Sequence, residues 1–165
     1  WVVIEWSREK KPKLIGLLTG GIAGLATITP CAGYVPLWAA ALIGTMAGIV
    51  CYMAVMLKNK MHWDDALDVW GVHGVGGVLG SILLGVFASK AVNANGVDGL
   101  IYGNAGFLGK QIVAVIIASA YAFLFTYLML AIINKITPVR VSEEEELKGL
   151  DSSIHGEVAY DEGAL

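Results

Sequence analysis

The feature that most constrains this chain is a series of apolar stretches as long as the hydrocarbon core of a bilayer. Residues 37–57 form the cleanest one, with 21 residues and no charge. Residues 14–29, 67–88 and 111–136 carry at most one charge each. Since a transmembrane helix needs about 20 consecutive apolar residues, we predict an all-α polytopic membrane protein.

The composition supports this class and argues against several others. Of the 165 residues, 56% are hydrophobic and 15% charged, and the mean hydropathy is +0.68, which is unusual for a soluble domain. We find no nucleophile–base pair, no phosphate-binding glycine loop and no basic aromatic surface, so we predict neither an enzyme nor a nucleic-acid partner, and no cofactor. The two cysteines, Cys31 and Cys51, lack metal-ligand spacing and are expected to be small buried residues at helix contacts.

Charge and hydropathy divide the chain into two parts. We expect a membrane domain over residues 1–138, with the end of one span followed by four spans near 14–30, 37–57, 65–88 and 111–136. Residues 139–165 form an aqueous tail, because 142–165 hold eight acidic residues and one lysine. Since the chain starts within an apolar element, with no leader-like segment before it, we expect it to be part of a longer protein.

The basic residues predict the orientation of the spans. The loops at 7–13 and 58–63, together with the segment from 135 onward, hold nine Lys or Arg residues. The loops on the other side hold only Lys90 and Lys110. Because basic residues collect on the cytoplasmic side, we expect the tail to be cytoplasmic and the fourth span to enter the membrane from that side.

The fourth span contains the histidine that most suggests a function. Asp64, Asp65 and Asp68 supply oxygens and negative charge suited to a helix N-terminus. If the helix begins near Asp64, His73 lies nine residues in, at about 13–14 Å and close to the bilayer midplane. An imidazole at that depth marks a substrate or proton pathway; the alternative is a histidine bonded between helices for packing. Asp68 either caps the helix or is the partner of a neighbouring span, and the alternative is that it lines a vestibule that attracts cations.

Glycines cluster around this histidine and recur elsewhere. They either allow close helix packing or leave the imidazole and backbone open to a narrow lumen, and the two roles are compatible. Small residues also recur every fourth position in the second and third spans, where we expect helix contacts. With no Cys, Asp or Glu beside His73 in the span, we expect no metal site. The glycines around His73 are Gly71, Gly74, Gly76, Gly77 and Gly80. Those of the second and third spans are Gly16, Gly20, Gly24, Gly44 and Gly48.

Three stretches resemble the ammonium transporter family (Amt/Mep, within the Amt/Mep/Rh superfamily). Residues 64–77, DDALDVWGVHGVGG, resemble its second-histidine helix. Residues 20–35, GGIAGLATITPCAGYV, resemble its glycine-rich helix and Thr-Pro turn, and residues 143–160, EEEELKGLDSSIHGEVAY, resemble its C-terminal tail. The resemblance covers essentially the whole chain and favours the Amt branch, because Gly74 follows the histidine where Rh proteins carry asparagine.

The resemblance implies a fold and a function. The fold is an eleven-helix bundle with two inverted halves, assembled as a homotrimer in the plasma membrane, and this chain corresponds to its C-terminal half. The function is passage of ammonium or ammonia through a hydrophobic twin-histidine pore. The alternatives are an ammonium sensor of the same fold that signals through the tail, and a fragment with a purely structural role.

The resemblance also assigns expected roles to individual positions. His73 matches one of the two pore histidines and Asp68 a structural carboxylate, while Trp70 stands where many members have phenylalanine. Gly74 and Gly77 are expected to support the pore. A PII-type signal protein is the expected partner at the cytoplasmic face, and Ser153 aligns with a position phosphorylated in plant members. The expected regulatory positions of the tail are Gly149, Asp151, Ser153, His155, Gly156 and Tyr160.

Overall fold

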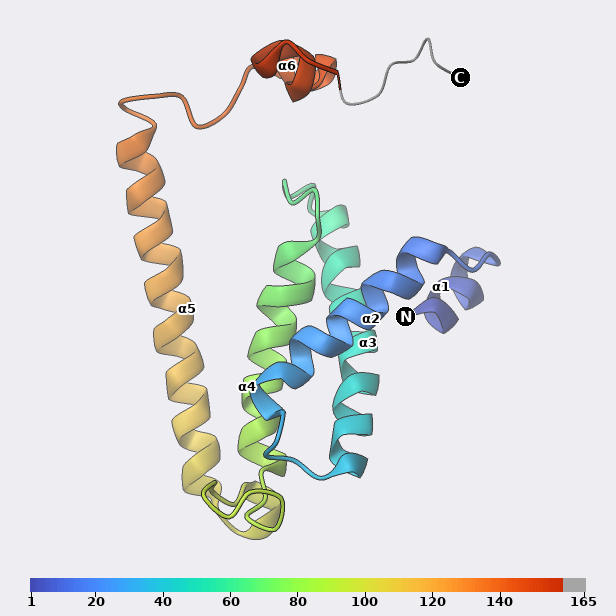
Figure 1. The fold of residues 1–165 in the computed structure, drawn as a ribbon, viewed down its shortest axis with the longest axis vertical. Coiled ribbons are helices and arrows are strands. Elements are labelled where there is room, and N and C mark those ends of the chain that lie inside the picture. Colours follow the sequence, from blue (N-terminus) through green and yellow to red (C-terminus); the bar gives the residue numbers. More distant parts are fainter. Residues whose placement is uncertain (159–165) are drawn as a thin grey trace. The chain divides into compact units, whose positions relative to one another are not determined.

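Every regular element that the computed structural model shows within residues 1–158, the part of the chain it describes, is helical. Two compact units divide the chain, Trp1–Ala118 and the residues from Ser119 onward, with the boundary inside the longest helix. The six α-helices, labelled in Figure 1, are α1 Val2–Glu9, α2 Leu14–Ile28, α3 Leu37–Lys60, α4 Val75–Phe87, α5 Ala105–Ile133 and α6 Glu143–Lys148.

Four helical segments are long and apolar enough to cross a membrane, namely Leu14–Cys31, Leu37–Lys60, Trp70–Phe87 and Ala105–Ile133. The predicted all-α class with several spans is therefore confirmed. The bounds differ by a few residues from those expected. α3 runs three residues further, to Lys60, and α5 lies earlier than expected, from Ala105 instead of 111 to Ile133 instead of 136.

The first unit is built around three helices, α2, α3 and α4, which pack against one another (Figure 1). Small side chains fill the contact, with Ala23, Cys51, Val55 and Val72 in one buried cluster. Cys31 belongs to a second buried cluster, and its thiol donates to the carbonyl oxygen of Gly80 at 3.2 Å. Both cysteines are buried and free, as expected from the sequence. Since small residues let backbones approach closely, this contact suits helices in lipid.

Two of the glycines that repeat along α2 accommodate α1. A Cβ at Gly16 would overlap the Glu5 carboxylate, and one at Gly20 would lie 2.6 Å from the Cβ of Trp1. A Cβ added at Gly24 or Gly44 would have nothing within 4 Å among the described residues. The expected glycine contacts are therefore present at Gly16 and Gly20 and are made with α1, which the sequence pattern did not indicate.

The longest helix, α5, has no buried residue within the described chain. Its beginning lies close to the end of α4, because a Cβ at Gly85 would be 2.9 Å from the Cα of Leu108. In the second unit, the short helix α6 begins at Ser142 with a reciprocal capping box. The Glu145 amide donates to the Ser142 hydroxyl, and the Ser142 amide donates to the Glu145 carboxylate. Such a box satisfies two otherwise unpaired donors.

Candidate functional site

The helix that carries His73 does not begin where the carboxylates suggested. It opens with a π-helical segment, Trp70–Gly74, which continues into α4. Residues 64–68 precede it, and Asp68 has a left-handed backbone with φ 56°. The expected start near Asp64 is therefore wrong. His73 is the fourth residue of the segment, roughly 5 Å along its axis rather than nine residues deep.

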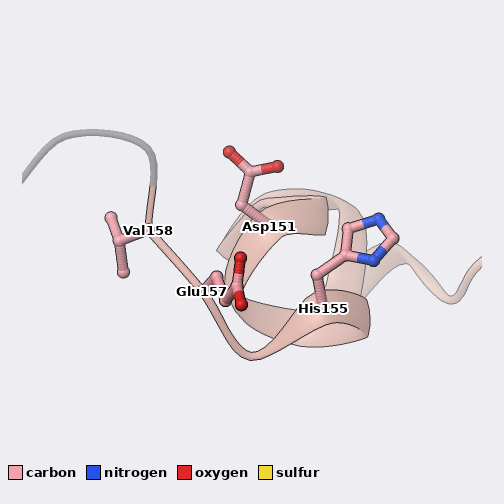
Figure 2. Close-up of a pocket in the computed structure, with 4 residues that line it drawn as sticks. All are labelled: Asp151, His155, Glu157 and Val158. Carbon is pink, nitrogen blue, oxygen red and sulfur yellow. The ribbon is translucent and has the colours of Figure 1, made fainter.

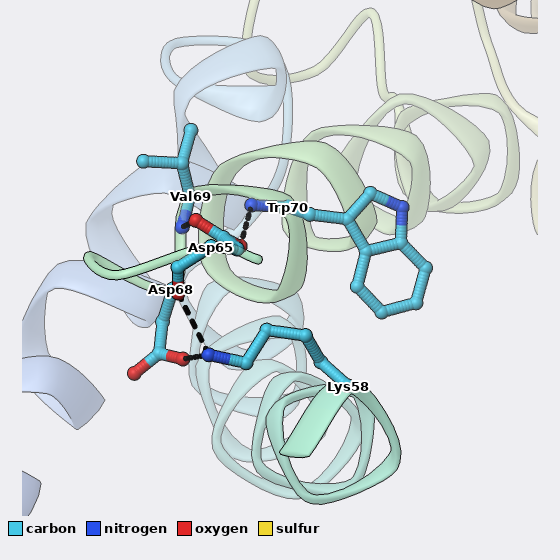
Figure 3. A network of polar contacts seen from close by, with 5 residues as sticks. All are labelled: Lys58, Asp65, Asp68, Val69 and Trp70. Carbon is cyan, nitrogen blue, oxygen red and sulfur yellow. Dashed lines mark hydrogen bonds and ion pairs between the residues drawn. The ribbon is translucent and has the colours of Figure 1, made fainter. Parts of the chain in front are cut away.

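A single carboxylate provides the cap at this helix start. The backbone N–H groups of Val69 and Trp70 donate to the two oxygens of Asp65, both at 2.9 Å (Figure 3). Asp65 therefore satisfies two of the amides that a helix leaves unpaired at its beginning. The capping role proposed for Asp65 is confirmed, whereas Asp68 forms an ion pair instead.

Asp68 pairs with a lysine at the end of α3. The Lys58 ammonium lies 2.6 Å from the Asp68 carboxylate and also donates to the backbone oxygen of Asp65 at 2.7 Å (Figure 3). Lys58 is only 7% exposed. A buried ammonium needs such partners, because taking a charge out of water is costly. Lys58 therefore connects the end of α3 to the loop before His73. The expectation that Asp68 is the partner of a neighbouring span is confirmed. The sequence did not identify Lys58 as that partner, because Lys58 resembles any basic residue at the end of a span.

The His73 residue is exposed, and its imidazole takes part in none of the side-chain hydrogen bonds found among the described residues. In a regular α-helix, residues 76 and 80 share a face with residue 73, yet Gly76 and Gly80 are buried against α2. A π-helical turn bonds residue i to i+5, and here the Val75 amide donates to the Trp70 oxygen. The wider turn changes the helical register, and His73 lies off the packed face.

The glycines near His73 fall into two groups. Those that pack are Gly71, where a Cβ would lie 2.6 Å from a Val55 methyl, and Gly76, where it would lie 2.8 Å from the Thr27 hydroxyl. A Cβ at Gly80 would overlap the Thr27 carbonyl oxygen. Gly74 is exposed, and Gly77 has nothing within 4 Å of its Cβ position. The two glycines expected to support a pore are thus the two that this chain leaves uncovered.

Trp70 lies at the start of the same helix and contacts an aromatic residue from the preceding loop. The rings of Trp63 and Trp70 meet edge to face, with centroids 5.0 Å apart and planes at 81°. Both indoles are partly exposed, 47% for Trp63 and 40% for Trp70. Such amphipathic rings suit the interface between membrane and water. Figure 3 shows the Trp70 ring extending away from the Lys58–Asp68 pair.

The tail places most of its expected regulatory positions in one turn. A π-helical segment, Asp151–His155, lies between Gly149 and Gly156, whose φ angles of 96° and 67° suit glycine. The Ser153 hydroxyl donates to the Gly149 oxygen at 2.8 Å. A small cavity of about 190 Å³ is lined by Asp151, His155, Glu157 and Val158 (Figure 2). Tyr160 lies outside the described residues.

Comparison with known proteins settles the family. The Ammonium Transporter Family profile matches residues 1–160. The chain belongs to the ammonium transporter family. An ammonium transporter of Bacillus subtilis is 46% identical to it over 161 residues, covering 97% of the chain and 40% of the relative. Amt1 of Archaeoglobus fulgidus is also 46% identical, over 160 residues and with the same coverage. The chain therefore spans about 40% of the length of these curated relatives.

Solved structures agree with this assignment. Mep2 of Saccharomyces cerevisiae is 39% identical to this chain. The two structures superpose with a TM-score of 0.82, covering 87% of this chain and 34% of Mep2. A protein named Sensor Amt Protein is 28% identical, with a TM-score of 0.78 over 92% of this chain and 37% of its own. The ammonium-transporter fold expected from the resemblance is confirmed for the part that this chain covers.

Proposed function

We propose that the whole protein moves ammonium or ammonia across a membrane and that His73 lines its conducting pathway as one of two imidazoles. The proposal rests on family membership and on one structural observation. His73 is exposed beside Gly74, whereas Gly71 and Val72 in the same turn are buried and Asp65 caps the helix start. A histidine buried only for packing would instead contact α2 or α3.

The chemistry of the imidazole fits this role. A neutral histidine donates one hydrogen bond and accepts another, and an imidazole can take up and release a proton. Ammonium must lose its charge, or have it compensated, to pass through an apolar lumen. An imidazole next to glycines provides an acceptor for that proton without blocking a narrow path. The chemical step is a reversible proton transfer, so the proposed role is transport rather than catalysis.

Replacement of His73 tests this proposal. In the full-length protein reconstituted into liposomes, His73→Asn should abolish ammonium-driven flux or change its selectivity over potassium, because asparagine hydrogen-bonds but does not exchange protons. The matched control is His62→Asn. His62 lies in the loop before the site with φ 55°, a conformation that asparagine tolerates. Unchanged flux and selectivity in His73→Asn would contradict the proposed role.

A sensor of the same fold is the second candidate, favoured by the similarity to the Sensor Amt Protein. The two candidate functions differ in flux. A transporter should give ammonium-dependent currents or pH changes in proteoliposomes at saturating substrate. A sensor should bind ammonium with little flux and transmit occupancy through the tail. Ammonium binding with no measurable flux in the wild-type protein would therefore replace the transport proposal by the sensor proposal.

The remaining architecture follows from the same proposal. Residues 1–138 form the membrane part and residues 139–165 a cytoplasmic regulatory tail, in a homotrimer at the plasma membrane. A PII-type signal protein binds the cytoplasmic face. Phosphorylation of Ser153 would remove the hydroxyl donor to the Gly149 oxygen and bring a dianion among backbone carbonyls, so it would disrupt this turn. Absence of phosphate from the tail in both nitrogen-replete and nitrogen-starved cells would contradict that role.

A further inference from the structure

A second polar site lies in the first unit, in a cavity of about 320 Å³ between α1, α2 and α3. Its lining includes the Glu5 carboxylate, the Tyr52 ring, and the polar side chains of Thr19 and Asn59. Glu9, Lys13 and Asp68 also line it. The cavity thus lies at the end of the helices where α1 ends and α2 begins. His73 is not among the residues that line it.

Glu5 is the unusual member of this lining. It is 9% exposed, and its Oε2 atom is buried with no hydrogen-bond partner among the described residues. The α2 backbone leaves room for its carboxylate only because residue 16 is glycine, since a Cβ there would overlap the carboxylate. A buried carboxylate without a donor or a counter-charge is costly. The described protein atoms therefore leave this oxygen unsatisfied.

Counting charges around the cavity shows which group lacks a partner. Glu9 forms an ion pair with Lys13, and this contact is the main cause of the raised pKa of Lys13. Asp68 forms its ion pair with Lys58. The third carboxylate, Glu5, forms no ion pair of its own among the described residues, although its charge also acts on Lys13. The lining therefore carries one uncompensated negative charge.

We propose that this cavity binds a monovalent cation, with the Glu5 carboxylate as its charged ligand. One uncompensated charge favours a monovalent ion over a divalent one, which would draw on carboxylates already engaged with lysines. Carboxylate, hydroxyl and amide oxygens suit hard cations such as sodium and potassium, and they also accept hydrogen bonds from ammonium. The ion reaches the site from water, since the Glu9 and Lys13 side chains on the lining are 43% and 52% exposed. The site does not depend on the proposed transport function, because binding is measured directly.

The test is equilibrium binding of radioactive rubidium, a potassium analogue, to the purified full-length protein, with choline chloride keeping ionic strength constant. We expect saturable binding of one rubidium ion per chain that depends on Glu5 and that potassium competes for. Glu5→Gln should weaken it at least about tenfold, the loss expected on removing a charged ligand. Glu144→Gln, which changes an exposed acid of α6 that is not among the residues lining the cavity, should bind as the wild type does.

Competition with sodium and with ammonium identifies the preferred ion. Thermal unfolding distinguishes a loss of ion binding from a loss of folding. The wild-type melting temperature should rise saturably with the preferred ion, whereas Glu5→Gln should not respond and should melt no lower than the wild type in choline alone. Three results would overturn the proposal. They are no saturable rubidium binding, unchanged binding in Glu5→Gln, or a Glu5→Gln protein that is strongly destabilised in choline while the wild type ignores cations.

Discussion

A carboxylate accepts a hydrogen bond from a backbone amide at the start of the helix that carries His73 and at the start of the short helix of the tail, yet the two starts are stabilised in different ways. At the first, Asp65 accepts from two backbone amides while the neighbouring Asp68 pairs with the buried Lys58, ten residues earlier on another helix. At the second, Ser142 and Glu145 satisfy each other across three residues, exposed to water. The first start depends on packing between helices and the second only on local sequence. A substitution at the first should therefore destabilise the packed helices, whereas one at the second should affect only the short helix.

The largest effect should come from Lys58→Met. This change leaves the Asp68 carboxylate without its ammonium and the Asp65 carbonyl without its donor. Removing one partner of a buried pair costs about 3–5 kcal/mol, and we expect roughly 3 kcal/mol because the Asp68 side chain is 31% exposed. Thermal unfolding of the full-length protein in detergent measures this loss.

Two further variants separate the pair from general damage at the end of α3. Lys60→Met, at an exposed position on the same helix end, should unfold as the wild type does. Lys58→Met combined with Asp68→Asn should recover part of the loss, because no unpaired charge remains. Equal destabilisation by the Lys58 and Lys60 changes would show that the ion pair contributes little.

The next effect concerns the cap on the His73 helix. Asp65→Ala removes the acceptor for the Val69 and Trp70 amides and should cost about 1–2 kcal/mol, the usual loss for an N-cap. Asp65→Asn keeps an acceptor oxygen and should cost much less. Because His73 follows closely, Asp65→Ala should also lower ammonium flux in liposomes. Identical unfolding of the Ala and Asn variants would show that the cap is not what holds this helix start.

Hydropathy and charge were enough to predict the all-α class, the four spans and the acidic tail, because these depend on local composition. Asp65 as a cap was also foreseeable. Lys58 as the partner of Asp68 was not, because their pairing requires the end of α3 to meet the loop before His73. The π-helical turn could not be predicted either. The hydropathy pattern of an apolar helix with many glycines is the same whether or not one turn contains an extra residue. The sequence therefore predicted a helix around His73 but placed the histidine too deep in it.

A smaller, local effect should follow from Ser142→Ala in the tail. The change removes the hydroxyl that accepts from the Glu145 amide, worth about 1 kcal/mol, or about a fivefold change in the population of α6. Hydrogen exchange of the amides in residues 142–148 should accelerate to that extent. Thermal unfolding of the membrane part should not change. A lower melting temperature for the whole protein would show that the tail contributes to the stability of the rest.

The smallest effect is a pH dependence of the same helix. The backbone N–H and the hydroxyl of Ser142 both donate to the Glu145 carboxylate and hold its pKa below the usual value. A lowered pKa means that the folded helix prefers the ionised form. The capping box is therefore fully formed above the ordinary glutamate pKa near 4.3 and is lost as pH falls through the lower folded value. The carboxyl carbon shift of Glu145, followed by NMR in a peptide of residues 139–158, should titrate below the ordinary glutamate pKa. Glu145→Gln preserves the box and removes its pH dependence, so a helix that loosens equally in acid with glutamine at this position would assign the effect to the other acidic residues.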